Sequence, residues 1–205
     1  MGVDYWWFGF LITEGDHARI RPLFEVARRE AEGTQALHAP AIEAWRANPE
    51  SYEDGVRTDN HATNAFQAAF LSPGFEALLR SLVMKGGALV DLAREEVVFR
   101  FTSIHRSPPV AVLWHALGFD RARALPGHMG NLLIHPRDAA RTSKEVDAVY
   151  RGLDLDDAFQ RGYSFCSGSE FSTGPVNDVV TLLPDGLRRA AELGKGFFAI
   201  SHKAP

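Results

Sequence analysis

The N-terminal stretch from Tyr5 to Ile12 is strongly apolar, and its pattern differs from that of a half-buried strand. Successive side chains of a strand point to opposite faces, so a strand with one wet face alternates apolar and polar residues. Here both faces are apolar: Tyr5, Trp7 and Leu11 on one, and Trp6, Phe8, Phe10 and Ile12 on the other. The pattern predicts a strand covered on both faces, or one whose second face is kept for a ligand or partner.

Further strands are expected at four places along the chain. The clearest is residues 96–104, where Val97, Phe99 and Phe101 alternate with polar residues. Shorter apolar runs predict strands at 132–134, 179–183 and 197–201. These runs are bounded by turn residues, which is typical of short strands.

Apolar residues that recur every three or four positions predict helices elsewhere, with glycines as stops and prolines in first turns. We expect helices at 22–32, near 37–45 with an interruption at Pro40, and at 60–71, 73–85, 108–117, 142–151, 154–166 and 184–193. Thr142 with Glu145 has the spacing of a capping box, and so does Asp154 with Asp157.

These elements predict one α+β domain over residues 1–205. Its small mixed or antiparallel sheet has the aromatic N-terminal strand in its centre and is covered by about seven to eight helices. The strands do not alternate regularly with helices, so a doubly wound sheet is not supported. With 205 residues, folding buries roughly 70% of the surface of the unfolded chain, which is ample for a core.

Charge and composition exclude several classes of partner. The formal net charge of −4 gives no basic face for nucleic acid or for an anionic membrane. The apolar N-terminal run is too short to span a bilayer and follows Asp4 instead of a basic flank. A single cysteine excludes an intramolecular disulfide and fits a reducing compartment, so we expect a cytoplasmic protein.

No motif for a cofactor or a metal is found, and we expect neither. The glycine spacing of dinucleotide and phosphate loops is absent, and the eight histidines form no His-Glu-x-x-His pair. His115 lies near the end of its predicted helix, where a cationic ring favours the negative helix terminus. His128 lies in a Gly-His-Met-Gly run and is a candidate catalytic residue, unless the run is only a tight turn.

The region from Cys166 to Asn177 offers a second group of candidates. Cys166 is a candidate nucleophile, with Glu170 nearby and with Ser167 and Ser169 as ligand-binding residues on a loop rich in small side chains. The alternatives are a packed thiol, since Cys166 continues an apolar helical row, and a solvated connection for the loop.

Other candidate ligand-binding residues lie beside the aromatic strand. His61 and Asn64 are three positions apart and therefore share a helix face, which contributes to a pocket or is simply exposed. Trp6 and Trp7 belong to the aromatic strand itself, where one face could bind a ligand.

Three function hypotheses follow. The first is a binding or interaction protein that sequesters an unknown protein partner or small ligand. The second is a small-molecule hydrolase or transferase that uses His128 with the Ser167–Asn177 loop. The third is a homo-oligomer with the aromatic strand at its interface, because large exposed apolar patches are rare on monomers.

Overall fold

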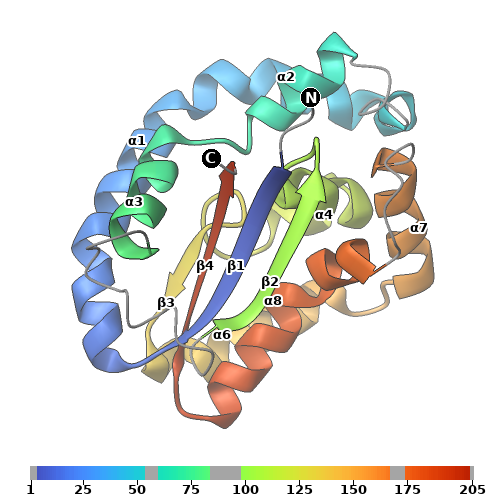
Figure 1. Cartoon of the computed structure of the whole chain (residues 1–205). Helices are drawn as coiled ribbons and strands as arrows, with labels where there is room; N and C mark the ends of the chain where they lie inside the picture. Colours follow the sequence, from blue (N-terminus) through green and yellow to red (C-terminus); the bar gives the residue numbers. More distant parts are fainter. Residues whose placement is uncertain (1–3, 54–59, 84–97, 167–173, 204–205) are drawn as a thin grey trace.

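The fold is known from a computed structural model, which describes residues 4–53, 60–83, 98–166 and 174–203. Its antiparallel sheet contains β1 (Asp4–Ile12), β2 (Val98–His105), β3 (Leu132–Ile134) and β4 (Gly196–Lys203). The strand order β2-β1-β4-β3 pairs β1 with β4, so segments from the two ends of the sequence meet in the middle of the sheet (Figure 1). The predicted sheet with a central aromatic strand is confirmed.

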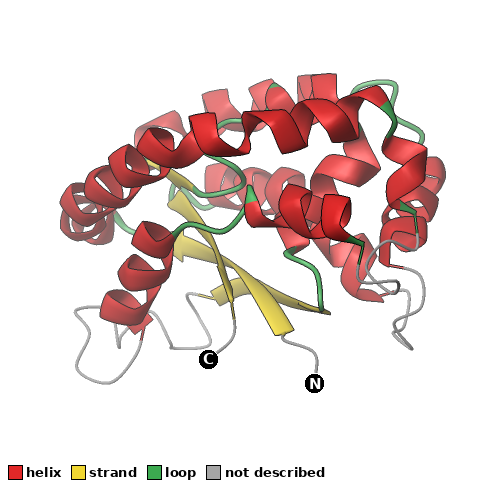
Figure 2. Cartoon of the chain, turned by 90° about the horizontal axis from the view of Figure 1, so that it is seen from above, coloured by secondary structure: helices red, strands yellow, loops and turns green. Residues whose placement is uncertain are grey.

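The described residues contain eight α-helices, in agreement with the prediction of about seven to eight. They are α1 (Glu14–Ala47), α2 (His61–Ala68), α3 (Pro73–Val83), α4 (Pro109–Leu117), α5 (Phe119–Arg123), α6 (Ala139–Tyr150), α7 (Leu155–Cys166) and α8 (Gly174–Glu192). In the same described residues, the 3₁₀ turn η1 (Pro49–Tyr52) follows α1, and η3 (Pro136–Asp138) lies between β3 and α6. Most of the helices lie on one side of the sheet (Figure 2).

Strand β1 contributes to two hydrophobic cores, one on each face. Trp7 and Leu11 belong to the larger core, which includes residues of α4, α7 and α8. Phe10 and Ile12 belong to a smaller core with α1 and α3. Trp7, Phe10 and Ile12 are all at most 1% exposed, so this part of the strand is covered on both faces.

Helix α1 corrects the prediction of two short helices, since it continues from Glu14 to Ala47 through Pro22, Gly33 and Pro40. A capping box between Thr13 and Asp16 starts it. Proline and glycine inside a helix are unfavourable, but tertiary packing supplies most of a helix's stability. The packing here is a row of buried residues: Ile20, Phe24, Ala27, Ala31, Ile42 and Trp45.

Helix α8 corrects two further predictions. Residues 179–183 were expected to form a strand and 184–193 a separate helix, whereas one helix runs through Pro184. Val179, Val180, Leu182 and Leu183 are each 0% exposed. A helix buried on nearly all sides presents a continuous apolar run, which cannot be distinguished from a buried strand by periodicity.

The starts of α6 and α7 differ in how well they were predicted. α6 begins at Ala139, and Thr142 is buried inside it, so the predicted capping box there is wrong. At α7, the carboxylate of Asp154 accepts hydrogen bonds from the backbone N–H groups of Asp156 and Asp157, as predicted for a cap. Among the described residues, we find no helix with both the length and the apolar character to cross a membrane.

Candidate functional site

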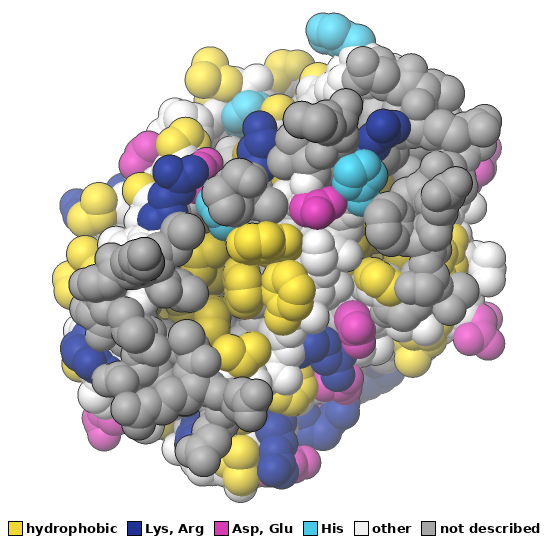
Figure 3. All heavy atoms as spheres, viewed as in Figure 1, with side chains coloured by type: hydrophobic (Ala, Val, Ile, Leu, Met, Phe, Trp, Pro, Cys, Tyr) yellow, Lys and Arg dark blue, Asp and Glu magenta, His cyan; other side chains and the backbone are white. Residues whose placement is uncertain are grey.

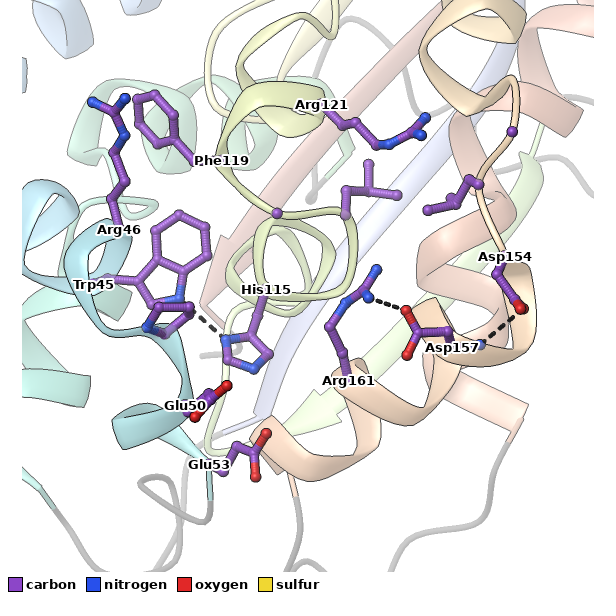
Figure 4. A pocket seen from close by; sticks show the side chains of 15 residues that line it. Trp45, Arg46, Glu50, Glu53, His115, Phe119, Arg121, Asp154, Asp157 and Arg161 are labelled. Atoms are coloured by element: carbon purple, nitrogen blue, oxygen red, sulfur yellow. Dashed lines mark hydrogen bonds and ion pairs between the residues drawn. The ribbon is translucent and has the colours of Figure 1, made fainter.

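A cavity of about 710 Å³ lies between the C-terminal end of α1, the turn η1, and helices α4, α5 and α7 (Figure 4). Its apolar lining includes Trp45, Leu117, Phe119 and Leu153. Ligand pockets for small molecules typically measure about 300–1,000 Å³ and combine apolar walls with a few polar groups. The cavity therefore has the size and lining of a small-molecule site.

His115 is the most deeply buried polar side chain in this lining, at 4% exposed. Its Nδ1 accepts a hydrogen bond of 3.1 Å from Nε1 of Trp45. The indole N–H can only donate, so Nδ1 carries no proton and the neutral ring holds its proton on Nε2. The ring also stacks on Phe165, with 4.9 Å between the centroids. Trp45 and Phe165 thus fix both the tautomer and the orientation of His115.

Burial and the nearby charge of Arg161 lower the pKa of His115 from 6.5 to about 4. The imidazole is therefore neutral at pH 7, since each of these causes disfavours a positive ring. The expectation of a cationic ring at the helix terminus is thus wrong. With its proton on Nε2, the ring offers a hydrogen-bond donor, and it cannot act as a base through that nitrogen.

Arg161 reaches the cavity from α7 and binds the end of α4. Its Nε and Nη2 donate to the carbonyl oxygen of Ala116 at 2.9 Å and 2.6 Å, and its Nη1 pairs with Asp157. Ala116 lies in the last turn of α4, where carbonyl groups lack helical partners. Three of the five guanidinium N–H groups are used in this way. For the other two, no partner is found among the described residues.

Two further arginines of the lining hold its walls together. Arg46 lies over the ring of Phe119, 4.4 Å from its centroid. Arg121 donates to the carbonyl groups of Val149 and Arg151 at the end of α6. These contacts attach the cavity's outer elements to one another.

Two carboxylates, those of Glu50 and Glu53, lie at the η1 side of the cavity near His115 (Figure 4). Both residues are exposed. Within the described part of the chain, neither carboxylate takes part in an ion pair or a side-chain hydrogen bond. No group of three or more histidine, cysteine, aspartate or glutamate residues that could hold a metal is found there either.

His128, the first sequence candidate, lies elsewhere. Its backbone N–H and carbonyl both pair with Asn131, which closes a turn with positive φ at Met129 and Gly130. The ring stacks on Phe75 and lines cavities of about 10 Å³ and 120 Å³. Burial lowers its pKa, with smaller effects from charges on α1.

Cys166 does not share a cavity with His128. Cys166 ends α7 in the larger core and lines neither of the small cavities beside His128. Burial raises the pKa of its thiol to about 12, so the thiol is protonated at neutral pH. Glu170, Ser167 and Ser169 lie outside the described residues.

The other predicted ligand-binding residues also lie outside the cavity lining. His61 and Asn64 are exposed on α2. Trp7 is buried, and its Nε1 donates to the carbonyl of Gly130 at 3.1 Å. Trp6 is half-buried on the opposite face of β1.

Trp6 belongs to an apolar patch on the face of the sheet seen in Figure 3, where hydrophobic side chains gather over its centre. Its ring contacts those of Phe8, Phe101 and His202. Phe101 is 45% exposed. The role of this patch as a ligand or subunit surface stays a prediction.

The sequence analysis did not predict that Trp45, His115 and Arg161 lie together in one site. Their positions are far apart in the sequence, and α1 was expected to break before Trp45. The available signal was a histidine inside the apolar 110–117 segment, because a buried polar group needs a partner.

Comparisons with known proteins add no identification, since no family model, curated protein or solved structure matches this chain.

Proposed function

We propose that this protein binds a small organic molecule in the cavity lined by Trp45 and His115. The observation that carries the proposal is the fixed tautomer of His115, whose Nε2–H has no acceptor among the described residues. This N–H borders the cavity, and a ligand acceptor can take the hydrogen bond that it otherwise makes with water. Because Trp45, Leu117, Phe119 and Leu153 give the cavity an apolar part, an apolar part of the ligand gains by burial there.

A binding function fits this site better than general-base catalysis. The nitrogen of His115 that faces the cavity carries a proton already, and Trp45 occupies the other nitrogen. The single buried thiol, Cys166, fits a reducing compartment, and we place the function in the cytoplasm.

A fragment screen by ¹H–¹⁵N NMR tests the proposal, because the indole N–H groups report on different parts of the structure. The indole of Trp45 donates to His115, whereas the indole of Trp7 donates to Gly130 on a different loop. A fragment in the cavity is expected to shift the Trp45 and His115 signals and to leave the Trp7 signal in place. Absence of any fragment that shifts the Trp45 signal would count against the proposal.

A variant that fills the cavity provides the matched control. Leu153→Trp adds a large ring to the partly buried lining, and Leu37→Trp makes the same change at a site that is 77% exposed. We expect Leu153→Trp to abolish fragment binding while Leu37→Trp retains it. Equal binding to both variants would show that the fragments bind elsewhere.

A further inference from the structure

The polar groups deepest in the cavity are hydrogen-bond donors. His115 offers Nε2–H, and Arg161 offers the two N–H groups that neither Ala116 nor Asp157 uses. Both residues line the cavity, and Figure 4 shows them side by side, His115 on α4 and Arg161 on α7. A ligand group that satisfies both must be an acceptor, and an oxyanion matches the forked geometry of a guanidinium.

The electrostatic influence on His115 is also positive. Arg161 is the charged residue that acts on its pKa, in the same direction as burial, whereas Glu50 and Glu53 have no resolved effect on it. Both glutamates are exposed, where water screens their charges. An acceptor with negative charge is therefore favoured next to His115, and a cation is not.

Part of the wall around these donors is apolar. Trp45 and Leu117 are buried, and they line the cavity together with Leu153. We infer that the ligand is an organic carboxylate with an apolar body, its oxygens bound by His115 and Arg161 and its body packed against Trp45, Leu117 and Leu153. This inference rests on the proposed function and specifies the ligand class for the same cavity.

Three probes of closely similar size test the inference: 3-phenylpropanoate, 3-phenylpropanamide and 3-phenylpropylammonium. We expect the carboxylate to bind about tenfold more tightly than the amide, because charge-assisted hydrogen bonds are the stronger kind, and the ammonium to bind most weakly. NMR titration of the Trp45 indole signal gives the three affinities. The carboxylate is also expected to shift the ¹⁵N signal of His115 Nε2 more than that of Nδ1.

Removal of a carboxylate at the cavity edge gives an independent test that leaves the core intact. Glu53→Gln is expected to tighten 3-phenylpropanoate binding about twofold and to weaken 3-phenylpropylammonium binding. Glu192→Gln makes the same change on α8 outside the cavity lining, and it is expected to alter neither affinity.

The inference is overturned if 3-phenylpropanoate does not bind, if the amide or the ammonium binds as tightly, or if Glu53→Gln weakens carboxylate binding. Failure of the proposed function looks different, because then no fragment of any charge shifts the Trp45 signal. A screen that finds only neutral or cationic ligands in the cavity would thus keep the binding function and reject the carboxylate.

Discussion

His115 and His128 are both buried enough for their pKa values to fall, but different parts of each residue hold it in place. The His115 ring is fixed by a side-chain hydrogen bond from Trp45, and it borders a cavity of about 710 Å³. The His128 backbone is fixed by two hydrogen bonds with Asn131, and its ring lies on Phe75 beside much smaller cavities.

The difference shows which kind of restraint prepares a side chain for binding. Hydrogen bonds between backbone groups hold a turn independently of its side chains, so the His128 turn does not depend on the imidazole ring. A hydrogen bond to one ring nitrogen determines what the other nitrogen can do, because it selects the tautomer. Of these two histidines, His115 is the one whose restrained ring borders a cavity of about 710 Å³.

Alanine substitution is expected to give the largest difference between the two histidines, measured as the loss in free energy of unfolding. His115→Ala removes a buried ring and leaves the Trp45 N–H unpaired, which should lower the free energy of unfolding by about 4 kcal/mol. His128→Ala keeps the backbone pairing with Asn131 and should cost about 1 kcal/mol. Urea unfolding followed by circular dichroism measures both values, and equal costs would show that the two sites are packed alike.

Acidification is expected to have the next largest effect. Folding lowers the pKa of His115 from 6.5 to about 4, so between these pH values the unfolded chain binds the proton and the folded chain does not. Stability from this residue is therefore full above pH 6.5 and is lost as the pH falls to 4, by about 3 kcal/mol in total.

Urea unfolding of the wild type and of His115→Gln at several pH values between 7 and 4 checks this expectation. The glutamine variant has no ring to titrate, so its stability should fall less over the same range. His128, whose pKa is also lowered, adds a dependence of the same sign to both proteins. If the two proteins show parallel curves, His115 is not the buried neutral group described above.

Substitutions at two glycines with positive φ compare how tightly the His128 turn and the edge of the cavity are packed. An added Cβ at Gly130 would lie 2.5 Å from Cγ2 of Val110, whereas at Gly152 it would meet nothing within 4 Å. Gly130→Ala should cost about 2–3 kcal/mol from backbone strain and the clash. Gly152→Ala should cost about 1 kcal/mol from backbone strain alone.

Thermal unfolding shows which of the two variants is less stable. NMR spectra add a second readout, since Gly130 also accepts the hydrogen bond of the Trp7 indole. We expect Gly130→Ala to shift the Trp7 signal and Gly152→Ala to leave it in place. The reverse order of stability would indicate that the cavity edge, and not the turn, is the tightly packed region.

The fold was predictable where local pattern and tertiary environment agree. The double apolar face of residues 5–12 correctly indicated a central strand, and Asp154 correctly indicated a helix start. The pattern failed at α1 and α8, because packing against neighbours outweighed the helix-breaking tendency of Pro22, Pro40 and Pro184. Such long-range packing is not encoded in any short window of sequence.

The candidate site was less predictable than the fold. Trp45 and His115 are 70 positions apart, and the hydrogen bond between them exists only after α1 and α4 have packed. A histidine on a glycine-rich loop indicates function because loops often carry it, whereas a histidine near a helix end is easily explained by the helix dipole. The burial that makes His115 neutral is a property of the tertiary structure.

The smallest expected effect concerns the ion pair between Arg161 and Asp157. Asp157 is 58% exposed in its side chain, so Asp157→Asn should change the free energy of unfolding by only about 0.5 kcal/mol. The guanidinium of Arg161 then loses its compensating charge, and its effect on the neighbouring imidazole grows. The pKa of His115 should therefore fall further, while that of His128 stays constant, because His128 has no resolved interaction with Arg161.

An NMR titration of both imidazoles in the wild type and in Asp157→Asn measures these shifts in one experiment. Asp156→Asn, one position earlier on α7, provides the matched control, because Asp156 does not pair with Arg161. A downward shift at His115 in Asp157→Asn alone would show that Arg161 determines the electrostatic potential at this end of the cavity. An unchanged His115 would mean that burial alone keeps the ring neutral, and a carboxylate would then lose its electrostatic advantage over an uncharged acceptor.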